Sequence, residues 1–295
     1  VATGILGGLA VLPISDPYLW ANSTASTQER NMISFSSRDF MTLDGGFLRP
    51  LDDSEYYTNT ANMAGAAGQN LNLSLPHTSV LDNLSVNSLR FGNLNDNLND
   101  SSGAYLIPGT RMVGWQQYSN ALTIDTGRTL TIASGMLLFA NMGQGINQDM
   151  QSYISGGTLS FGAKEGIITN VNGYYRTSDG QMVSNGAYIR STIAGTVAAG
   201  SVAITKAGLG EVFFDGLNTY TGITKVADGP LSLRNNMALG AGGTGNGVIV
   251  EGSGQLYHRL GVNIGQNTAS QVDSTLANNG LNLQASREDI HVGIL

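Results

Sequence analysis

A short internal repeat limits what this chain can fold into. The tripeptide Ile204-Thr205-Lys206 recurs as Ile223-Thr224-Lys225, and the same offset places Gly210 onto Gly229. The match continues through two apolar pairs, Val212 with Leu231 and Phe214 with Leu233. A unit of roughly 20 residues cannot bury its own apolar face, so successive units must stack as in a solenoid.

Four glycines divide the first of these units into short segments. Gly210, Gly216, Gly222 and Gly229 follow one another at nearly even intervals. Because glycine accepts positive φ values, we expect the chain to turn a sharp corner at each of them. The short strands between corners predict a three-sided coil of roughly 20 residues, with its apolar positions inside.

Alternating apolar and polar residues indicate that the chain from about position 85 onward is built in the same way. A glycine followed by apolar residues at every second position recurs at 127–132, 157–161 and 254–258. Alternation of this kind predicts strands with one face to the core and one to water. We therefore predict an all-β fold, a right-handed parallel β-helix, whose regular part spans residues 86–295.

Residues 1–85 show weaker periodicity. They contain Asp16-Pro17, Asp52-Asp53 and a run of small residues at 61–68, which are typical of turns and loops. No Pro-rich or Ser-rich linker separates them from the rest of the chain. We predict that residues 1–85 form decorated or capping coils of the same β-helix.

Composition excludes several classes of function. The 295 residues include 40 glycines but only 12% charged residues, and the net charge is −7 without a cluster of Lys or Arg. Such a surface lacks the basic footprint that nucleic acids and anionic membranes require. The absence of cysteine removes thiolate catalysis and thiolate metal sites. We predict no cofactor, no metal, no nucleic-acid partner and no membrane span in this segment.

Residues 204–233 closely resemble the autotransporter-associated β-strand repeat, also called the passenger-associated transport repeat. The core Asn218-Thr219-Tyr220-Thr221-Gly222 is the most specific part of the resemblance. The segment Ala238-Leu239-Gly240 looks like the one that usually follows this repeat. Two positions depart from the pattern, because Glu211 stands where Thr or Ala is usual and Pro230 where a small residue is usual.

The resemblance implies a β-helix on, or released from, the surface of a bacterium with an outer membrane, and it implies no particular activity. The residues that carry the repeat motif are Lys206, Gly208, Gly210, Gly216, Asn218, Thr219, Tyr220, Thr221, Gly222, Thr224 and Gly229. We expect Asn218 to bond to neighbouring backbone and the threonines to favour strand geometry and bond across coils. We expect Tyr220 to cap the core with its hydroxyl directed outward.

Residues suited to catalysis are few. Histidine occurs only at His77, His258 and His291, with Glu251 near the second and Glu288-Asp289 near the third. We interpret the histidines as solvated strand residues rather than parts of a metal site or catalytic triad. The cluster Arg287-Glu288-Asp289 with His291 is the best catalytic alternative, because alternation places Asp289 and His291 on one face of a strand.

A polysaccharide-cleaving or polysaccharide-binding enzyme is the alternative on this fold. It would need carboxylates on adjacent coils beside aromatic rings that hold a sugar. The candidate carboxylates are Asp52, Asp53, Glu55, Asp215 and Asp228, and the candidate rings are Tyr56, Tyr57, Trp115 and Tyr118. Asp215 and Asp228 stand beside glycines, so turn formation explains them equally well.

Three functions are compatible with these patterns. The first is a non-enzymatic rod that displays or adheres at the cell surface through contacts with glycans or proteins. The second is self-assembly into a fibre or layer, because apolar, uncapped end coils would offer strand edges for pairing. The third is the enzyme described above. We predict a non-enzymatic extracellular structural protein, with its own end coils and cell-surface glycans or proteins as partners.

Overall fold

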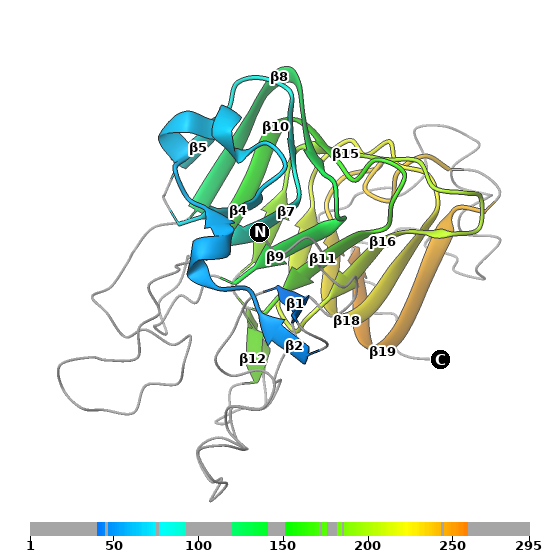
Figure 1. Cartoon of the computed structure of the whole chain (residues 1–295). Helices are drawn as coiled ribbons and strands as arrows, with labels where there is room; N and C mark the ends of the chain where they lie inside the picture. Colours follow the sequence, from blue (N-terminus) through cyan, green and yellow to red (C-terminus); the bar gives the residue numbers. More distant parts are fainter. Residues whose placement is uncertain are drawn as a thin grey trace, which may run out of the picture.

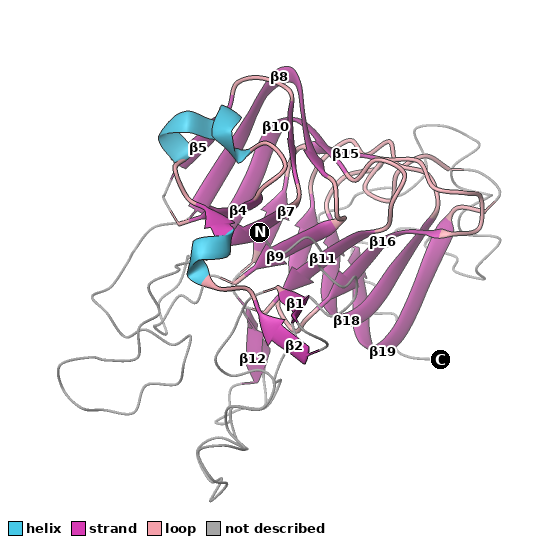
Figure 2. Ribbon diagram, in the orientation of Figure 1, coloured by secondary structure: helices cyan, strands magenta, loops and turns pink. Residues whose placement is uncertain are grey.

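The computed structural model describes residues 40–44, 47–74, 77–92, 120–140, 151–171, 173–175, 182–184, 186–242 and 245–258. Most of these residues lie in strands. Fifteen strands form one sheet, in which every pair is parallel, and Figure 2 shows this sheet curling around the molecule. The predicted parallel β-helix is confirmed.

The coils have three sides, which we call A, B and C. Side A contains β5 (His77–Val80), the first halves of β8 (Asn120–Ile132) and β10 (Ser152–Ser160), β14 (Ala187–Ile189), β17 (Val212–Phe214), and the second halves of β18 (Ile223–Leu233) and β19 (Gly247–His258). Side B contains β6 (Leu84–Val86), the second halves of β8 and β10, and β15 (Thr192–Ala194).

Side C contains β3 (Tyr56–Tyr57), β4 (Asn70–Leu73), β7 (Ser88–Phe91), β9 (Met136–Phe139), β11 (Gly166–Asn170), β16 (Val202–Ala207) and the first halves of β18 and β19. Long strands therefore bend at a corner and serve two sides. β8 pairs with β5 before its corner and with β6 after it.

Alternation along each strand separates the core from the surface. On β8, Leu122 and Ile124 are fully buried, whereas Thr123 between them is exposed. Residues at the same position of successive coils stack, as Phe91 and Phe139 do with ring centroids 4.9 Å apart. Burial of such continuous apolar rows supplies the main force that holds one coil on the next.

The predicted repeat offset is right on side A and wrong by one position on side C. Val212 pairs with Leu231, as the offset predicts. Ile204 pairs with Thr224 rather than with Ile223. The reason is the connection to side A, because the chain from Lys206 to Val212 is one residue longer than the chain between their partners, Val226 and Leu231.

The corner glycines serve two different purposes. Gly222 has a φ of 118° and Gly229 a φ of 60°, so these two confirm the predicted sharp corners. Gly210 and Gly216 do not have positive φ, and for them the prediction is wrong. They are required for space, because a Cβ on Gly216 would lie 2.1 Å from the carbonyl oxygen of Ser191. A Cβ on Gly210 would lie 2.4 Å from the side chain of Asn170.

The first strands belong to the same stack. β3 pairs with β4, and both β5 and β6 pair with β8. Two short 3-10 helices precede and follow β3, namely η1 (Asp53–Glu55) and η2 (Thr60–Ala66). η2 contacts β4, β5 and β6 and buries Ala66 in the core, at the end of the stack seen in Figure 1. The domain boundary at residue 85 stays a prediction.

A second apolar cluster lies outside the coil, on the outer face of side C. Phe40 and Leu51 pack there against Met136 and Leu138, which alternate with core residues of β9. The residues between Phe40 and Leu51 include an antiparallel hairpin of β1 (Met41–Asp44) and β2 (Phe47–Pro50), and a second antiparallel pair joins β12 (Gly173–Tyr175) to β13 (Met182–Ser184).

In the described part of the chain no helix is long and apolar enough to cross a membrane.

Candidate functional site

Lys206, the first residue of the repeat motif, occupies a core position. On side C it stands in register with apolar residues of β11 and β18, and its side chain is fully buried. Its Nζ donates hydrogen bonds to the carbonyl oxygens of Gly208 and Asp228. Burial lowers the pKa of Lys206 from 10.5 to about 7, against the opposing charges of Asp228 and Glu211. Backbone carbonyls from two coils thus hold one amine inside the stack.

Asn218 connects three successive coils. It is fully buried, its Oδ1 accepts a hydrogen bond of 2.8 Å from the backbone N–H of Ile193, and its Nδ2 donates one of 2.7 Å to the carbonyl oxygen of Ala238. Ile193 belongs to the coil before and Ala238 to the coil after. Since a buried backbone group must be paired, Asn218 satisfies two groups that the irregular corner would leave without partners.

Tyr220 points into the core, so the expected outward hydroxyl is wrong. The residue is 1% exposed, and its hydroxyl shares a 2.6 Å hydrogen bond with Oγ1 of Thr224. Burial raises the pKa of Tyr220. Thr219 is exposed, whereas Thr221 forms a parallel bridge with Thr196 of the preceding coil. The motif is therefore built into the interior of the stack and offers little to a ligand.

A different group of side chains lies on the outer face of side A and its following corner. We call it the aromatic–arginine ladder, and it consists of Tyr153, Tyr188, Phe213, Arg190, Asp215 and Arg234. Sequence reasoning missed it, because its members are far apart along the chain and come together only through the register of the coils. The sequence signal was an aromatic residue between two residues that are buried, in each of the three strands.

The three rings of the ladder stack along the axis of the β-helix. Tyr153 and Tyr188 lie in register on β10 and β14 with centroids 5.1 Å apart, and Tyr188 and Phe213 have centroids 4.2 Å apart with planes at 1°. Contacts of this kind contribute about 0.5 to 1.5 kcal/mol beyond burial. Because the rings cover each other's faces, they present edges rather than an open platform.

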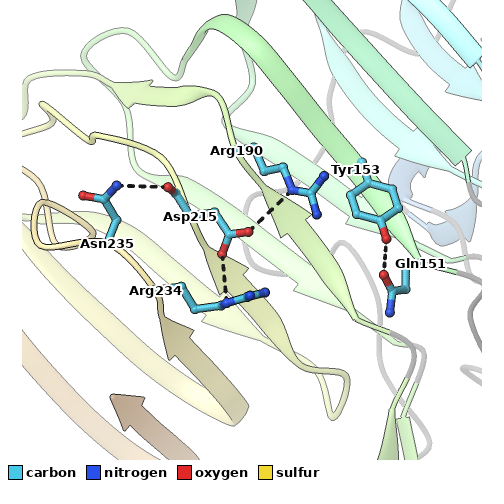
Figure 3. Close-up of polar contacts among 6 residues, drawn as sticks. All are labelled: Gln151, Tyr153, Arg190, Asp215, Arg234 and Asn235. Atoms are coloured by element: carbon cyan, nitrogen blue, oxygen red, sulfur yellow. Dashed lines mark hydrogen bonds and ion pairs between the residues drawn. The ribbon is translucent and has the colours of Figure 1, made fainter. Parts of the chain in front are cut away.

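The corner after these strands has charges of alternating sign. Asp215 lies between the two arginines, with one carboxylate oxygen 3.5 Å from Nε of Arg190 and the other 3.8 Å from Nε of Arg234 (Figure 3). Arg190 also lies over Tyr153, 4.5 Å from the ring centroid. Burial raises the pKa of Asp215, and the charges of Arg234 and Arg190 oppose that rise. The pKa of Tyr188 is also raised, mainly by burial.

Three of the carboxylates considered for catalysis, Asp52, Glu55 and Asp215, have other roles. Asp52 and Glu55 bond to backbone around η1, where Asp52 accepts from the N–H of Ser54 at 3.0 Å and Glu55 from the N–H of Asp52 at 2.7 Å. Asp215 pairs with arginines, so ion pairing rather than turn formation explains it. Among the described residues no three Asp, Glu, His or Cys side chains form a group that could hold a metal.

The aromatic and histidine candidates are also dispersed. Tyr56 is buried in the outer cluster of side C, and the hydroxyl of Tyr57 donates to the carbonyl oxygen of Asn62. His77 is exposed as expected, but His258 is 3% exposed, so its interpretation as a solvated residue is wrong. The remaining candidates lie outside the described residues: Trp115, Tyr118, Arg287, Glu288, Asp289 and His291.

Comparison with known proteins finds a distant relative. An alignment of 217 residues, 27% identical, matches the chain to the Adhesin BmaC autotransporter of Brucella suis biovar 1 (strain 1330). The alignment covers 72% of this chain but only 5% of the relative. No protein-family profile and no solved structure matches. The chain is thus similar to part of an autotransporter adhesin, while its membership of the repeat family stays a prediction.

Proposed function

We propose that this chain is a non-enzymatic segment of a cell-surface adhesin, a β-helical rod that carries contact surfaces away from the cell. The observation that carries the proposal is the stack of parallel coils around one continuous apolar core. Such a stack is stiff along its axis and repeats its outer face at every coil. The similarity to an autotransporter adhesin supports an extracellular location and a role in adhesion.

The location is tested by labelling intact cells of the source bacterium with antibodies raised against the chain. We expect labelling without permeabilisation and loss of the signal after brief treatment of the cells with protease. Labelling that requires permeabilised cells would contradict the proposal. A periplasmic protein serves as the control for envelope integrity.

The non-enzymatic character is tested separately with the purified chain. Acidic and neutral polysaccharides are incubated with it, and reducing ends and unsaturated uronates are measured. We expect no release above buffer, because Asp215, a half-buried outer carboxylate, is engaged by two arginines rather than placed beside a second carboxylate. Turnover that is lost in the Asp215→Asn variant would contradict the non-enzymatic proposal and support the polysaccharide-cleaving alternative.

A further inference from the structure

We propose that the aromatic–arginine ladder is a binding site for an acidic glycan, with one carboxylate or sulfate group held by Arg190 and another by Arg234. This inference deepens the adhesin role proposed above and rests on it. The site is an outer face of the stack, and its ligand is a linear polymer that runs along the axis of the β-helix.

The two arginine side chains stay partly exposed beside their contacts with Asp215. Asp215 contacts both arginines through Nε. The Nη atoms form the planar fork of each guanidinium, and the side chains of Arg190 and Arg234 are 51% and 30% exposed. Such a fork matches the two oxygens of a carboxylate or sulfate.

Both arginines are held in place before a ligand arrives. Arg190 lies over the rings of Tyr153 and Tyr188, and Arg234 lies 5.6 Å from the centroid of Phe213. Rings and carboxylate together fix side chains that would otherwise lose rotamer freedom on binding, and that loss normally weakens a complex. A structural ion pair alone would not require either arginine side chain to stay partly exposed.

The spacing of the arginines suits a linear polymer. Arg190, Asp215 and Arg234 belong to three successive coils, so the backbones of the two arginines are two strand spacings apart, about 9.6 Å, and both side chains reach the carboxylate between them. A linear glycan with an acidic group on alternate sugars presents its charges at a regular interval along one direction. The ring of Tyr188 lies 5.5 Å from the guanidinium of Arg190 and 5.8 Å from that of Arg234, so its hydroxyl can donate to a sugar oxygen at the same site.

The net charge of −7 repels an acidic polymer at long range. Attraction therefore comes from the guanidinium groups at contact, and Asp215 offsets part of it. We expect weak binding at one site, which falls as salt is added. A weak site of this kind supports adhesion when many copies of the protein act together on one surface.

The test uses the full chain and three probes, hyaluronan for carboxylate, dextran sulfate for sulfate and dextran as the neutral polymer. Binding is measured by biolayer interferometry at two salt concentrations. We expect binding to at least one acidic polymer and none to dextran, and the polymer that binds identifies the acidic group. Equal binding to dextran, or binding to none of the three, would overturn the inference.

Variants locate the site. Arg190→Gln and Arg234→Gln should each weaken binding roughly tenfold, as for the loss of one charge-assisted hydrogen bond. Arg190→Lys should lose less, because it keeps the charge without the fork. Arg128→Gln is the matched control, since Arg128 is 46% exposed and pairs with Asp82 on another part of the surface. Unchanged affinity in both ladder variants, or an equal loss in the control, would place binding elsewhere.

Folding of each variant is checked by circular dichroism and thermal unfolding before binding is compared. The two proposals fail in different assays. A chain that labels on intact cells but binds no acidic polymer retains its adhesin role without this site. A chain that binds hyaluronan through the arginines but lies inside the cell retains the site and loses the adhesin role.

Discussion

Lys206 and Asn218 are polar residues placed where the stack is otherwise apolar. Each reaches backbone groups of a neighbouring coil, Lys206 the carbonyl of Asp228 and Asn218 the carbonyl of Ala238. Hydrogen bonds of this kind contribute a modest net stability, but leaving the partner unpaired costs more. The two side chains therefore fix the register of the coils more than they add to their stability.

Lys206 makes stability depend on pH in a definite direction. Its pKa is about 7 in the folded chain against an ordinary value of 10.5, so between these values the unfolded chain binds one more proton. Stability should therefore rise with pH from 7 to 10, by at most about 1.4 kcal/mol per unit. Urea unfolding at several pH values measures this slope. Lys206→Met should remove it, whereas Lys225→Met, which replaces a partly exposed lysine of the next coil, should keep it.

Asn218→Ala should lower the free energy of unfolding by roughly 2 to 5 kcal/mol, because it leaves a buried N–H and a buried carbonyl without partners. Thr219→Ala is the matched control, since Thr219 is the exposed next residue. Urea denaturation of the three proteins gives the comparison. A loss for Asn218→Ala no larger than that of the control would show that water replaces both bonds.

At the scale of elements, the corners decide where strands begin and end. Gly216 does not have a positive φ but has no room for a side chain, whereas Gly127 has a φ of 74° and no atom within 4 Å of a Cβ. The two glycines separate close approach from backbone conformation as reasons for glycine at a corner. Sequence alone does not distinguish these two reasons, because both require a glycine at the corner.

Replacement of these glycines by alanine should give unequal losses. Gly216→Ala should cost roughly 2 to 3 kcal/mol, because the coil must move to admit a methyl group beside the carbonyl of Ser191. Gly127→Ala should cost about 1 kcal/mol, the strain of a left-handed conformation. Thermal and urea unfolding measure both. A larger loss for Gly127→Ala than for Gly216→Ala would mean that the coils accommodate a methyl group more easily than the backbone accommodates a left-handed alanine.

The strands of the regular part were predictable because alternation is a local property, and it is visible wherever one face of a strand is buried. The register was not, since nothing in the residues themselves marks that the chain from Lys206 to Val212 is one residue longer than the chain from Val226 to Leu231. The same limit applies to the aromatic–arginine ladder, which depends on coils of unequal length. The outer cluster around Met136 and Leu138 was hidden because a strand buried on both faces loses its alternation.

At the scale of the whole molecule, each described coil pairs its strands only with those of the coils beside it. One end is covered by η2, and β19 pairs only with β18 among the described strands. Stability in such an array is a sum of coil terms and nearest-neighbour terms, so an end coil has one neighbour where a central coil has two. Self-association through the end coils stays a proposal, which light scattering over a range of concentrations would test.

Hydrogen exchange should therefore be graded along the axis. We expect the slowest amide exchange in β10, β11 and β16, and faster exchange in β3 and β19, because opening from an end breaks one interface and opening from the middle breaks two. Mass spectrometry of peptides from the native chain measures the gradient. Uniform protection along the stack would indicate a single cooperative unit instead.

The unequal coil lengths have a mechanical consequence. Phe213 pairs with Tyr188 of the coil before and Ser232 of the coil after, and the chain from Tyr188 to Phe213 is longer than the chain from Phe213 to Ser232. Neighbouring coils therefore store different lengths of chain. Tension between the two ends of the rod would peel one coil at a time, and each would release roughly 65 to 85 Å of extended chain. A rod of this kind lengthens in steps under load, while the coils that have not yet opened stay folded and keep their contact surfaces.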